Sequence, residues 1–272
     1  MGRGIGIDPS AHPERLTGAA AAKIEWITDF YSEAYAHLQA DAVVCRHTLE
    51  HIAPVGDFMR MIRSSIGDRT DTIVLFELPD VRRVLEEVAF WDVYYEHCSY
   101  FSAGSLARLF RSSGFDVLDV ALDYDDQYLL VEARPSATVP AQGAPFQIED
   151  DMAVLSEAVT GFDTAYRAIL DRWSSKVTDV VRADGNVVIW GAGSKGVAFL
   201  TALDIHDEIR FAVDINPHKH GMFMAGTGQE IVSPQHLVAY DPDLVVVMNP
   251  VYLDEIRAEI QELGIRPEVV AV

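Results

Sequence analysis

The chain has 272 residues, of which 49% are hydrophobic, so it is long enough for one large domain or two ordinary ones with packed cores. Its 42 acidic residues outnumber its 21 basic residues and give a formal net charge of −21, which argues against nucleic acid and anionic membranes as partners. The only cysteines are Cys45 and Cys98, too few for a disulfide framework or a four-cysteine zinc site. With neither a membrane-length apolar run nor a signal-peptide pattern, we expect a cytoplasmic protein that handles small molecules.

Short apolar runs alternate with helical patterns through the first part of the chain. Four runs are brief, rich in β-branched residues and nearly continuous in hydrophobicity, which predicts buried parallel strands. They cover residues 4–8, 23–27, 41–45 and 72–78. Helical character is expected between them, over residues 18–23 and 57–66. The alternation of strands and helices predicts an α/β fold.

The next elements have clearer boundaries. Residues 102–115 predict a helix with Ser102 as its N-cap and Gly114 at its end. Two further strands, at 116–122 and 127–133, are separated only by a short acidic turn, so they should pair antiparallel.

A linker rich in Pro, Ser and Ala over residues 134–145 separates this part from the rest. A helical pattern then covers residues 148–182, and a second α/β unit follows. Its strands are expected at 187–190, 209–214, 243–249 and 268–272, with an amphipathic helix at 253–264 and loops at 216–221 and 226–234.

Polar residues follow the first three predicted strands. Asp8 stands at the carboxyl end of the first strand, where an acid commonly binds ribose hydroxyls, although it could simply initiate a turn before Pro9. Asp29 and Phe30 follow the second strand, where an adenine amino group could be bound. Arg46 and His47 end the third strand and could contact a ligand.

Glu50 and His51 come next, in the stretch "CRHTLEHI". They lack the H-E-x-x-H spacing of a zinc site, so they are read as a polar pair at the start of a helix. No metal is expected in this chain.

The stretch "GAGSKG" (191–196) matches G-x-G-x-x-G, follows a predicted strand and precedes a helical pattern. Asp214 ends the next strand, at the distance expected for a dinucleotide-binding fingerprint. The alternative is a fold that kept the tight turn and lost the ligand. The residues assigned to substrate or nucleotide binding are Gly191, Gly193, Ser194, Lys195, Gly196 and Asp214.

The stretch "DVYYEHCSYFS" (92–102) gathers four aromatic residues around Glu96 and His97, after the strand at 72–78. It could be a core that tolerates one polar pair, or a site where an imidazole is tuned to take a proton. Adjacent residues do not share a face of a helix or strand, so Glu96 and His97 can converge only if this stretch is irregular.

Taken in order, these motifs resemble the class I methyltransferases that use S-adenosylmethionine, and more narrowly the sugar C-methyltransferases that methylate nucleotide-linked keto-deoxysugars. The "YYEHCSYFS" string is the most specific element of the resemblance, and "GAGSKG" with "DINPHKHGMFMAGTGQEIVSP" is similar to that family's C-terminal Rossmann-like domain. The resemblance implies that His97 is the base that removes the proton beside the sugar ketone. It implies that Tyr94 and Glu96 orient the base or stabilise the enolate.

The resemblance also implies two Rossmann-like, doubly wound modules. Residues 1–135 would form an N-terminally truncated methyltransferase domain, 136–183 a linker and helical segment, and 184–272 the C-terminal domain. S-adenosylmethionine would be bound through Asp8, Asp29, Phe30, Arg46 and His47.

The sequence departs from the family at three places. The family's N-terminal zinc domain and its glycine-rich loop after the first strand have no counterpart here, so we expect impaired cofactor binding and a gap or exposed edge in the first sheet. The family's HGGSLR-like string is replaced by "DYDDQYLLVEARP", which leaves the acceptor open, with a sugar or nucleotide sugar favoured. The alternatives to a methyltransferase are an NAD(P)-binding oxidoreductase that uses "GAGSKG" and an inactive homologue.

Overall fold

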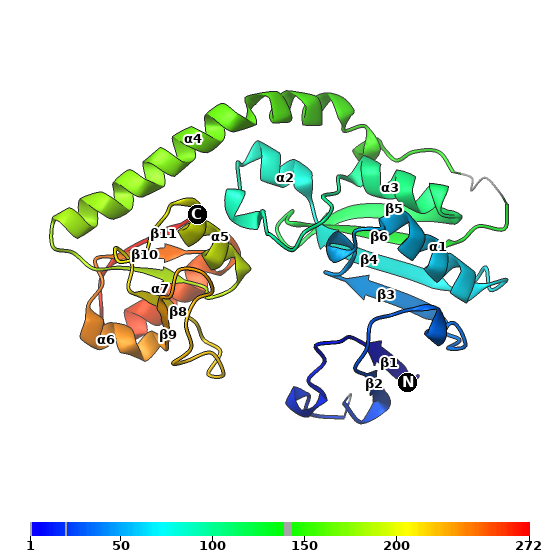
Figure 1. Ribbon diagram of the computed structural model, residues 1–272, viewed down its shortest axis with the longest axis horizontal. Helices are drawn as coiled ribbons and strands as arrows, with labels where there is room; N and C mark the ends of the chain where they lie inside the picture. The colour runs from blue at the N-terminus through cyan, green and yellow to red at the C-terminus, as the bar shows by residue number, and fades with distance from the viewer. Residues whose placement is uncertain (1, 20, 139–142) are drawn as a thin grey trace.

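The structure is a computed structural model that describes residues 2–19, 21–138 and 143–272. Part of the expected helical stretch at 18–23 (Ala20) and of the expected linker (139–142) lies outside the described residues. Figure 1 shows two α/β modules bridged by one long helix, with a small two-stranded unit at the N-terminus. Within the described ranges, no helix combines the length and the apolar character needed to cross a membrane.

The first module is built on a four-stranded sheet in the order β3-β4-β6-β5. Its strands are β3 (Ala42–Arg46), β4 (Ile73–Pro79), β5 (Phe115–Asp123) and β6 (Tyr128–Pro135). β3 and β4 are parallel, whereas β6 is antiparallel to β4 and to β5, as the short acidic turn predicted. The helices α1 (Val55–Ile66) and α3 (Ala103–Ser112) place their apolar stripes in one core with this sheet.

That sheet is covered on one face, which corrects the expectation of strands buried on both faces. Along β4, Val74, Phe76 and Leu78 have 0% exposure, while Leu75 and Glu77 between them are half-buried. At the edge of the sheet, Val44 of β3 is 58% exposed. Strand alternation therefore decides which side of the sheet carries the core.

The N-terminal strands form a separate sheet. β1 (Gly4–Ile7) and β2 (Ile24–Ile27) pair in parallel with each other and with no other strand of the described chain. A Cβ at Gly6 would lie 2.5 Å from the Trp26 ring, so a larger residue here would force that ring to move. One edge of β1 and one edge of β3 thus stay unpaired in the described ranges, so the expected gap in the first sheet is present (Figure 1).

The second module is a five-stranded parallel sheet in the order β11-β10-β7-β8-β9. Its strands are β7 (Val187–Trp190), β8 (Phe211–Val213), β9 (Glu230–Val232), β10 (Leu244–Val247) and β11 (Glu268–Ala271). Every residue of β7 and β10 is buried, because hydrophobic clusters cover both faces. Helices α5 (Ser194–Ala202), α6 (Leu237–Tyr240) and α7 (Leu253–Glu262) complete the module. The prediction of a loop over 226–234 is wrong, since β9 lies within it.

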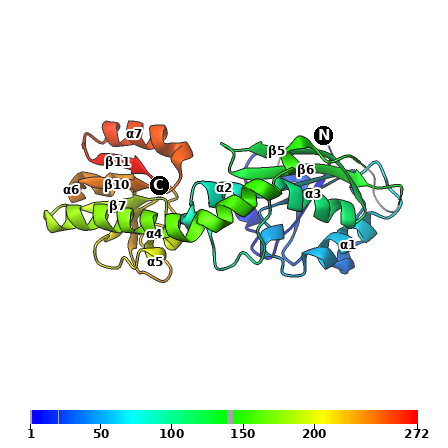
Figure 2. The same ribbon diagram turned by 90° about the horizontal axis from the view of Figure 1, so that it is seen from above.

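Two connections join the modules. Helix α4 (Met152–Arg182) runs from the first module to the second, where Trp173 and Val177 are buried (Figure 2). The second connection follows the short helix α2 (Val81–Glu86), where Ala89, Phe90 and Trp91 enter a hydrophobic cluster of the second module. Phe90 stacks on Phe199 of α5 with ring centroids 6.0 Å apart. The segment that leads into "DVYYEHCSYFS" is therefore anchored in the opposite module.

Candidate active site between the two modules

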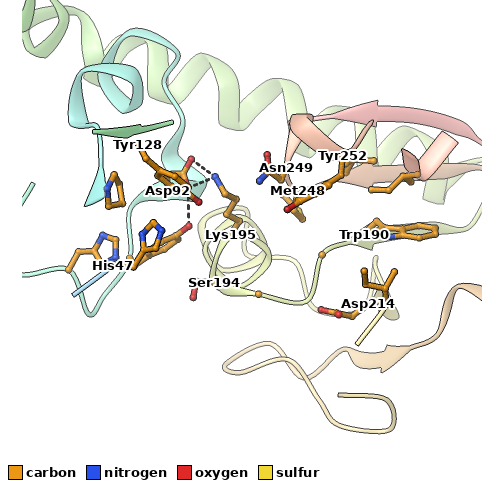
Figure 3. Close-up of a pocket in the computed structure, with 18 of the residues that line it drawn as sticks. His47, Asp92, Tyr128, Trp190, Ser194, Lys195, Asp214, Met248, Asn249 and Tyr252 are labelled. Carbon is orange, nitrogen blue, oxygen red and sulfur yellow. Dashed lines mark hydrogen bonds and ion pairs between the residues drawn. The ribbon is translucent and has the colours of Figure 1, made fainter. Parts of the chain in front are cut away.

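A cavity of about 620 Å³ lies between the modules and is lined by residues of both. The first module contributes the ends of β3 and β4 and the segment after α2, and the second contributes the ends of β7, β8 and β10 together with α7 (Figure 3). Both sheets thus present the carboxyl ends of parallel strands to one space, the usual position of ligand sites in α/β folds.

His97 lies on irregular backbone, as the geometry of neighbouring residues requires. The short 3-10 helix at Phe90–Asp92 ends before it, and the His97 amide donates to the Tyr94 carbonyl at 3.2 Å. The imidazole stands edge-on to the Tyr94 ring, with centroids 4.6 Å apart, and edge-on to the His51 ring at 4.8 Å. The next amide, of Cys98, donates to the Glu50 carbonyl at 2.8 Å and fixes the segment on the helix-entry turn.

The surroundings of His97 favour a neutral imidazole. Burial lowers its pKa, an effect that the nearby Glu50 carboxylate opposes and His51 adds to. The Nδ1 atom of His97 and the Oε2 atom of Glu50 are buried without a hydrogen-bond partner. His51 Nδ1 lies 3.2 Å from the Glu96 carbonyl oxygen, which can only accept, so His51 donates through this nitrogen.

Tyr94 and Glu96 differ in their relation to His97. The Tyr94 hydroxyl donates to Asp92 Oδ1 at 2.9 Å, and burial together with the Asp92 charge raises the pKa of Tyr94, so the phenol stays protonated. The Glu96 side chain is exposed at the cavity wall, and it is the backbone carbonyl of Glu96 that contacts His51. The structure thus brings Tyr94 and His97 together, while the Glu96 carboxylate faces solvent.

A buried polar junction beside Tyr94 was missed by sequence reasoning. Lys195 Nζ lies 2.5 Å from Asp92 Oδ1 and 2.7 Å from Oδ2, and Arg83 Nη1 donates to Asp92 Oδ2 at 2.8 Å. The Lys195 ammonium also donates to Gln127 at 3.3 Å, and Gln127 donates to Asn249 at 3.1 Å. The two cations lower the pKa of Asp92 although its burial alone would raise it. The one sign in the sequence that Asp92 belongs to the site was its position at the start of "DVYYEHCSYFS".

The residues expected to bind the cofactor are dispersed. Only His47 lines the cavity, and its Nε2 lies 2.9 Å from Glu77, which Arg46 also contacts at 2.7 Å. The other three of the set are exposed on the β1–β2 unit: Asp8, Asp29 and Phe30.

The acids on that unit are oriented by local hydrogen bonds. Asp8 accepts from the Ser10 amide at 2.6 Å, and Asp29 accepts from the Tyr35 hydroxyl at 2.5 Å and from the Phe30 amide at 2.8 Å. The hydrogen bonds from Tyr35 and Phe30 lower the pKa of Asp29.

The glycines of "GAGSKG" serve a tight turn and close packing. Gly191 has a φ of +123°, and a Cβ on Gly196 would lie 2.6 Å from the Gly191 carbonyl oxygen. The charged residues of the fingerprint are already engaged, because Lys195 binds Asp92 and the Asp214 carboxylate accepts from Lys219 Nζ at 2.8 Å. Gly193, Ser194 and Asp214 line the cavity.

Within the described ranges, Glu50, His51 and His97 form a group that could hold a metal ion, since each offers one ligand atom and these atoms lie within 4.8 Å of one another. A cation bound by this trio would occupy the lone pair with which the His97 imidazole would accept a proton. Metal binding and proton acceptance by His97 therefore exclude each other.

Two family models match consecutive parts of the chain. A methyltransferase domain matches residues 3–120, and a C-methyltransferase C-terminal domain matches residues 135–266. Among curated proteins, C-methyltransferase NovU of Streptomyces niveus is 30% identical over 271 residues, which cover 93% of this chain and 63% of the relative. The chain therefore spans less than two thirds of the length of the relative that it matches.

Two similar solved structures overlap with about half of the chain. The N,N-8-amino-8-demethyl-D-riboflavin dimethyltransferase RosA of Streptomyces davawensis is 20% identical, with a TM-score of 0.39 over 49% of this chain and 42% of its own. TnmH is 18% identical, with a TM-score of 0.37 over 49% and 43% of the two chains. The two matched domains follow one another along nearly the whole sequence, so the chain is similar to C-methyltransferases over both of its modules.

Proposed function

We propose that the protein takes part in S-adenosylmethionine-dependent C-methylation of a small molecule that carries an acidic C–H beside a carbonyl group, with a sugar or nucleotide sugar as the acceptor. The observation that carries the proposal is His97, a half-buried imidazole with an unpartnered nitrogen at the wall of the inter-module cavity. We propose residues 1–135 as the methyl-transfer domain, 136–183 as a linker and helix, and 184–272 as the domain that covers the acceptor.

His97 accepts the proton from the acceptor carbon in this proposal. Its lowered pKa keeps the ring neutral near pH 7, and Glu50 stabilises the imidazolium that forms. Tyr94 stays protonated and bonded to Asp92, and its ring, edge-on to the imidazole, orients the base. The aromatic rings of Tyr94, Tyr100 and Tyr128 limit access of water. We assign the exposed Glu96 carboxylate to acceptor binding or orientation of the base.

The methyl donor supplies an electrophilic methyl group when bound. Asp8 and Asp29, at the ends of β1 and β2, fit the hydroxyl and amino groups of its nucleoside, because both are exposed carboxylates oriented by backbone amides. Phe30, which is 72% exposed, offers a ring face, and Arg46 and His47 lie where the donor would approach the cavity. The gap between β1 and β3 separates these two groups of residues, so we expect weak donor binding by residues 1–272.

Isothermal titration with S-adenosylhomocysteine tests donor binding. Binding should be weak for this chain and clear for a version extended upstream with a strand and a glycine-rich loop. Absence of binding in the extended protein would refute the methyltransferase assignment.

The nicotinamide alternative is less well supported, because Lys195 and Asp214 are both engaged in ion pairs. It is tested by titrating the protein into NADH and NADPH. We expect no change in nicotinamide or tryptophan fluorescence up to millimolar cofactor, and saturable binding would favour the oxidoreductase.

A further inference from the structure

The second module contributes directly to the surroundings of His97. Phe90 and Trp91, which precede the base-bearing segment, are 4% exposed and belong to the hydrophobic cluster around α5. The chain then reaches Asp92, Tyr94 and His97 within seven residues, without regular secondary structure after the 3-10 helix. Such a segment has no ladder of its own, so its position depends on side-chain contacts in addition to the bond from the Cys98 amide to the Glu50 carbonyl.

Lys195 is the most direct of these contacts. It lies in the first turn of α5, its side chain is 16% exposed, and its ammonium binds both oxygens of Asp92. Asp92 in turn accepts from the Tyr94 hydroxyl, and the Tyr94 ring packs edge-on against His97. A continuous path thus leads from the glycine-rich loop through Lys195, Asp92 and Tyr94 to the imidazole.

The charges around the cavity argue against Lys195 as a phosphate ligand. Lys195 is the single lysine or arginine among the described residues that line the cavity, whereas six carboxylates line it: Glu50, Asp92, Glu96, Asp214, Glu255 and Glu259. Its ammonium charge is already compensated by Asp92 at 2.5 Å. A phosphate would have to displace that carboxylate and leave it buried beside an anion.

We propose that Lys195 is a positioning residue: by holding Asp92 it fixes the Tyr94 hydroxyl and ring against His97, so that "GAGSKG" clamps the base-bearing segment of the other module instead of cradling a phosphate. This role rests on the proposed function, since it concerns the same proton abstraction. It assigns the glycine-rich loop a task in assembling the site.

The test uses the proton-abstraction step alone, which needs no methyl donor. A nucleotide-linked keto-deoxysugar is incubated in D₂O, and exchange at the carbon beside its ketone is followed by NMR. Lys195→Met should lower the exchange rate at saturating sugar by roughly 10- to 100-fold, the usual cost of misplacing a catalytic group, with little change in the half-saturating sugar concentration. Lys195→Arg, which keeps the positive charge, should recover part of the loss.

Two further variants sharpen the result. Asp92→Asn should reproduce the Lys195→Met effect, and the double variant should be no worse than either, because both lie on one path. The matched control is Lys176→Gln, which removes an ion pair at 2.7 Å between α4 and Glu268 of β11, away from the residues that line the cavity, and should exchange like the wild type. A rise in the half-saturating concentration with an unchanged maximal rate would instead make Lys195 an acceptor ligand and overturn the proposal.

A second measurement separates this proposal from the proposed function. In hydrogen–deuterium exchange of the whole protein, amides of residues 93–101 should exchange faster in Lys195→Met than in the wild type. In Lys176→Gln the same amides should exchange at the wild-type rate. Equal protection in all three proteins would refute the clamp. If the wild type fails to exchange the sugar proton, the function or the chosen acceptor is wrong, and the amide exchange still decides the role of Lys195.

Discussion

At the scale of single residues, His97 is distinguished by the balance of charges around a buried ring. Burial lowers its pKa most, His51 acts in the same direction, and Glu50, Glu96 and Asp92 oppose them. A lowered pKa means that the neutral, proton-accepting form persists to more acidic pH than for an ordinary histidine, whose pKa is about 6.5.

The rate of sugar-proton exchange should therefore keep its neutral-pH value down to below about pH 6.5 before it falls, since protonation of His97 removes the acceptor. The measurement is the maximal exchange rate between pH 5 and 8. His97→Gln should abolish exchange, while His37→Gln, an exposed histidine on another loop, should leave the profile unchanged. An acid limb centred above 6.5 would contradict the prediction.

Asp80 gives a second residue-scale prediction, on stability. Its side chain caps α2 by accepting from the Arg82 amide at 3.1 Å, and its burial raises the pKa to about 6. An acid with a raised pKa in the folded state stabilises the fold below its unfolded pKa and loses that contribution as pH rises through about 6.

Asp80→Asn keeps the capping acceptor and cannot ionise. We expect the variant to unfold at a temperature about 2 °C higher than the wild type at pH 8, and the difference to shrink toward zero at pH 4. Thermal melts at the two pH values measure this. The same difference at both values would show that ionisation of Asp80 is not the cause.

The sequence predicted the position of His97 because its segment is a local string that follows a predicted strand. It could not predict the partner of Asp92, since Lys195 is 103 residues away and belongs to a motif whose usual task is different. The ion pair between Lys219 and Asp214 could not be predicted either. The two residues are close in the sequence, but only the folded turn shows that their side chains lie 2.8 Å apart.

At the scale of elements, strand positions followed from hydrophobic runs, whereas strand environment did not. β9 and β8 both have three residues, but β8 lies within the apolar run at 209–214, whereas β9 is flanked by glycines and a proline in the stretch 226–234, which is typical of a loop. β7 and β10 are buried on both faces and β4 on one, although all three read as apolar runs in the sequence. Helices that are distant in the sequence decide whether one face or both faces of a strand are covered. The sequence of the strand alone therefore does not predict its burial.

The unpaired edges of β1 and β3 give the element-scale prediction. Exposed strand edges pair with other chains, and the 58% exposed Val44 makes the β3 edge apolar. We expect concentration-dependent self-association in analytical ultracentrifugation, and Val44→Lys should reduce it because a charge on an edge strand discourages pairing.

The matched control is Val159→Lys on α4, a valine of similar exposure (59%) on a helix. It should leave the association unchanged. A wild type that stays monomeric at all concentrations, or an equal effect of both lysines, would contradict the edge as the cause.

At the scale of the whole molecule, the two modules share one hydrophobic cluster. Phe90 leaves the first module and packs against Phe199 of the second module and Tyr166 of α4, with ring centroids 6.0 and 5.8 Å away. Two further contacts join the modules at Tyr252 and Asn249, which line the cavity: the Tyr124 hydroxyl bonds that of Tyr252, and Gln127 donates to Asn249. We infer that neither module keeps its native core when the other unfolds.

Phe90→Ala should therefore destabilise both modules. Loss of a buried phenylalanine costs about 3–5 kcal/mol, and the shared cluster distributes that loss over one cooperative transition. The measurement is urea unfolding followed by hydrogen–deuterium exchange of peptides from β4 and β6 in the first module and from β7 and β10 in the second. Both sets should shift to lower urea by the same amount, whereas the control Phe223→Ala, which removes a 66% exposed ring, should shift neither. A shift confined to the β7 and β10 peptides would mean that the modules unfold independently, and the base-bearing segment would then be held by the second module without stabilising the first.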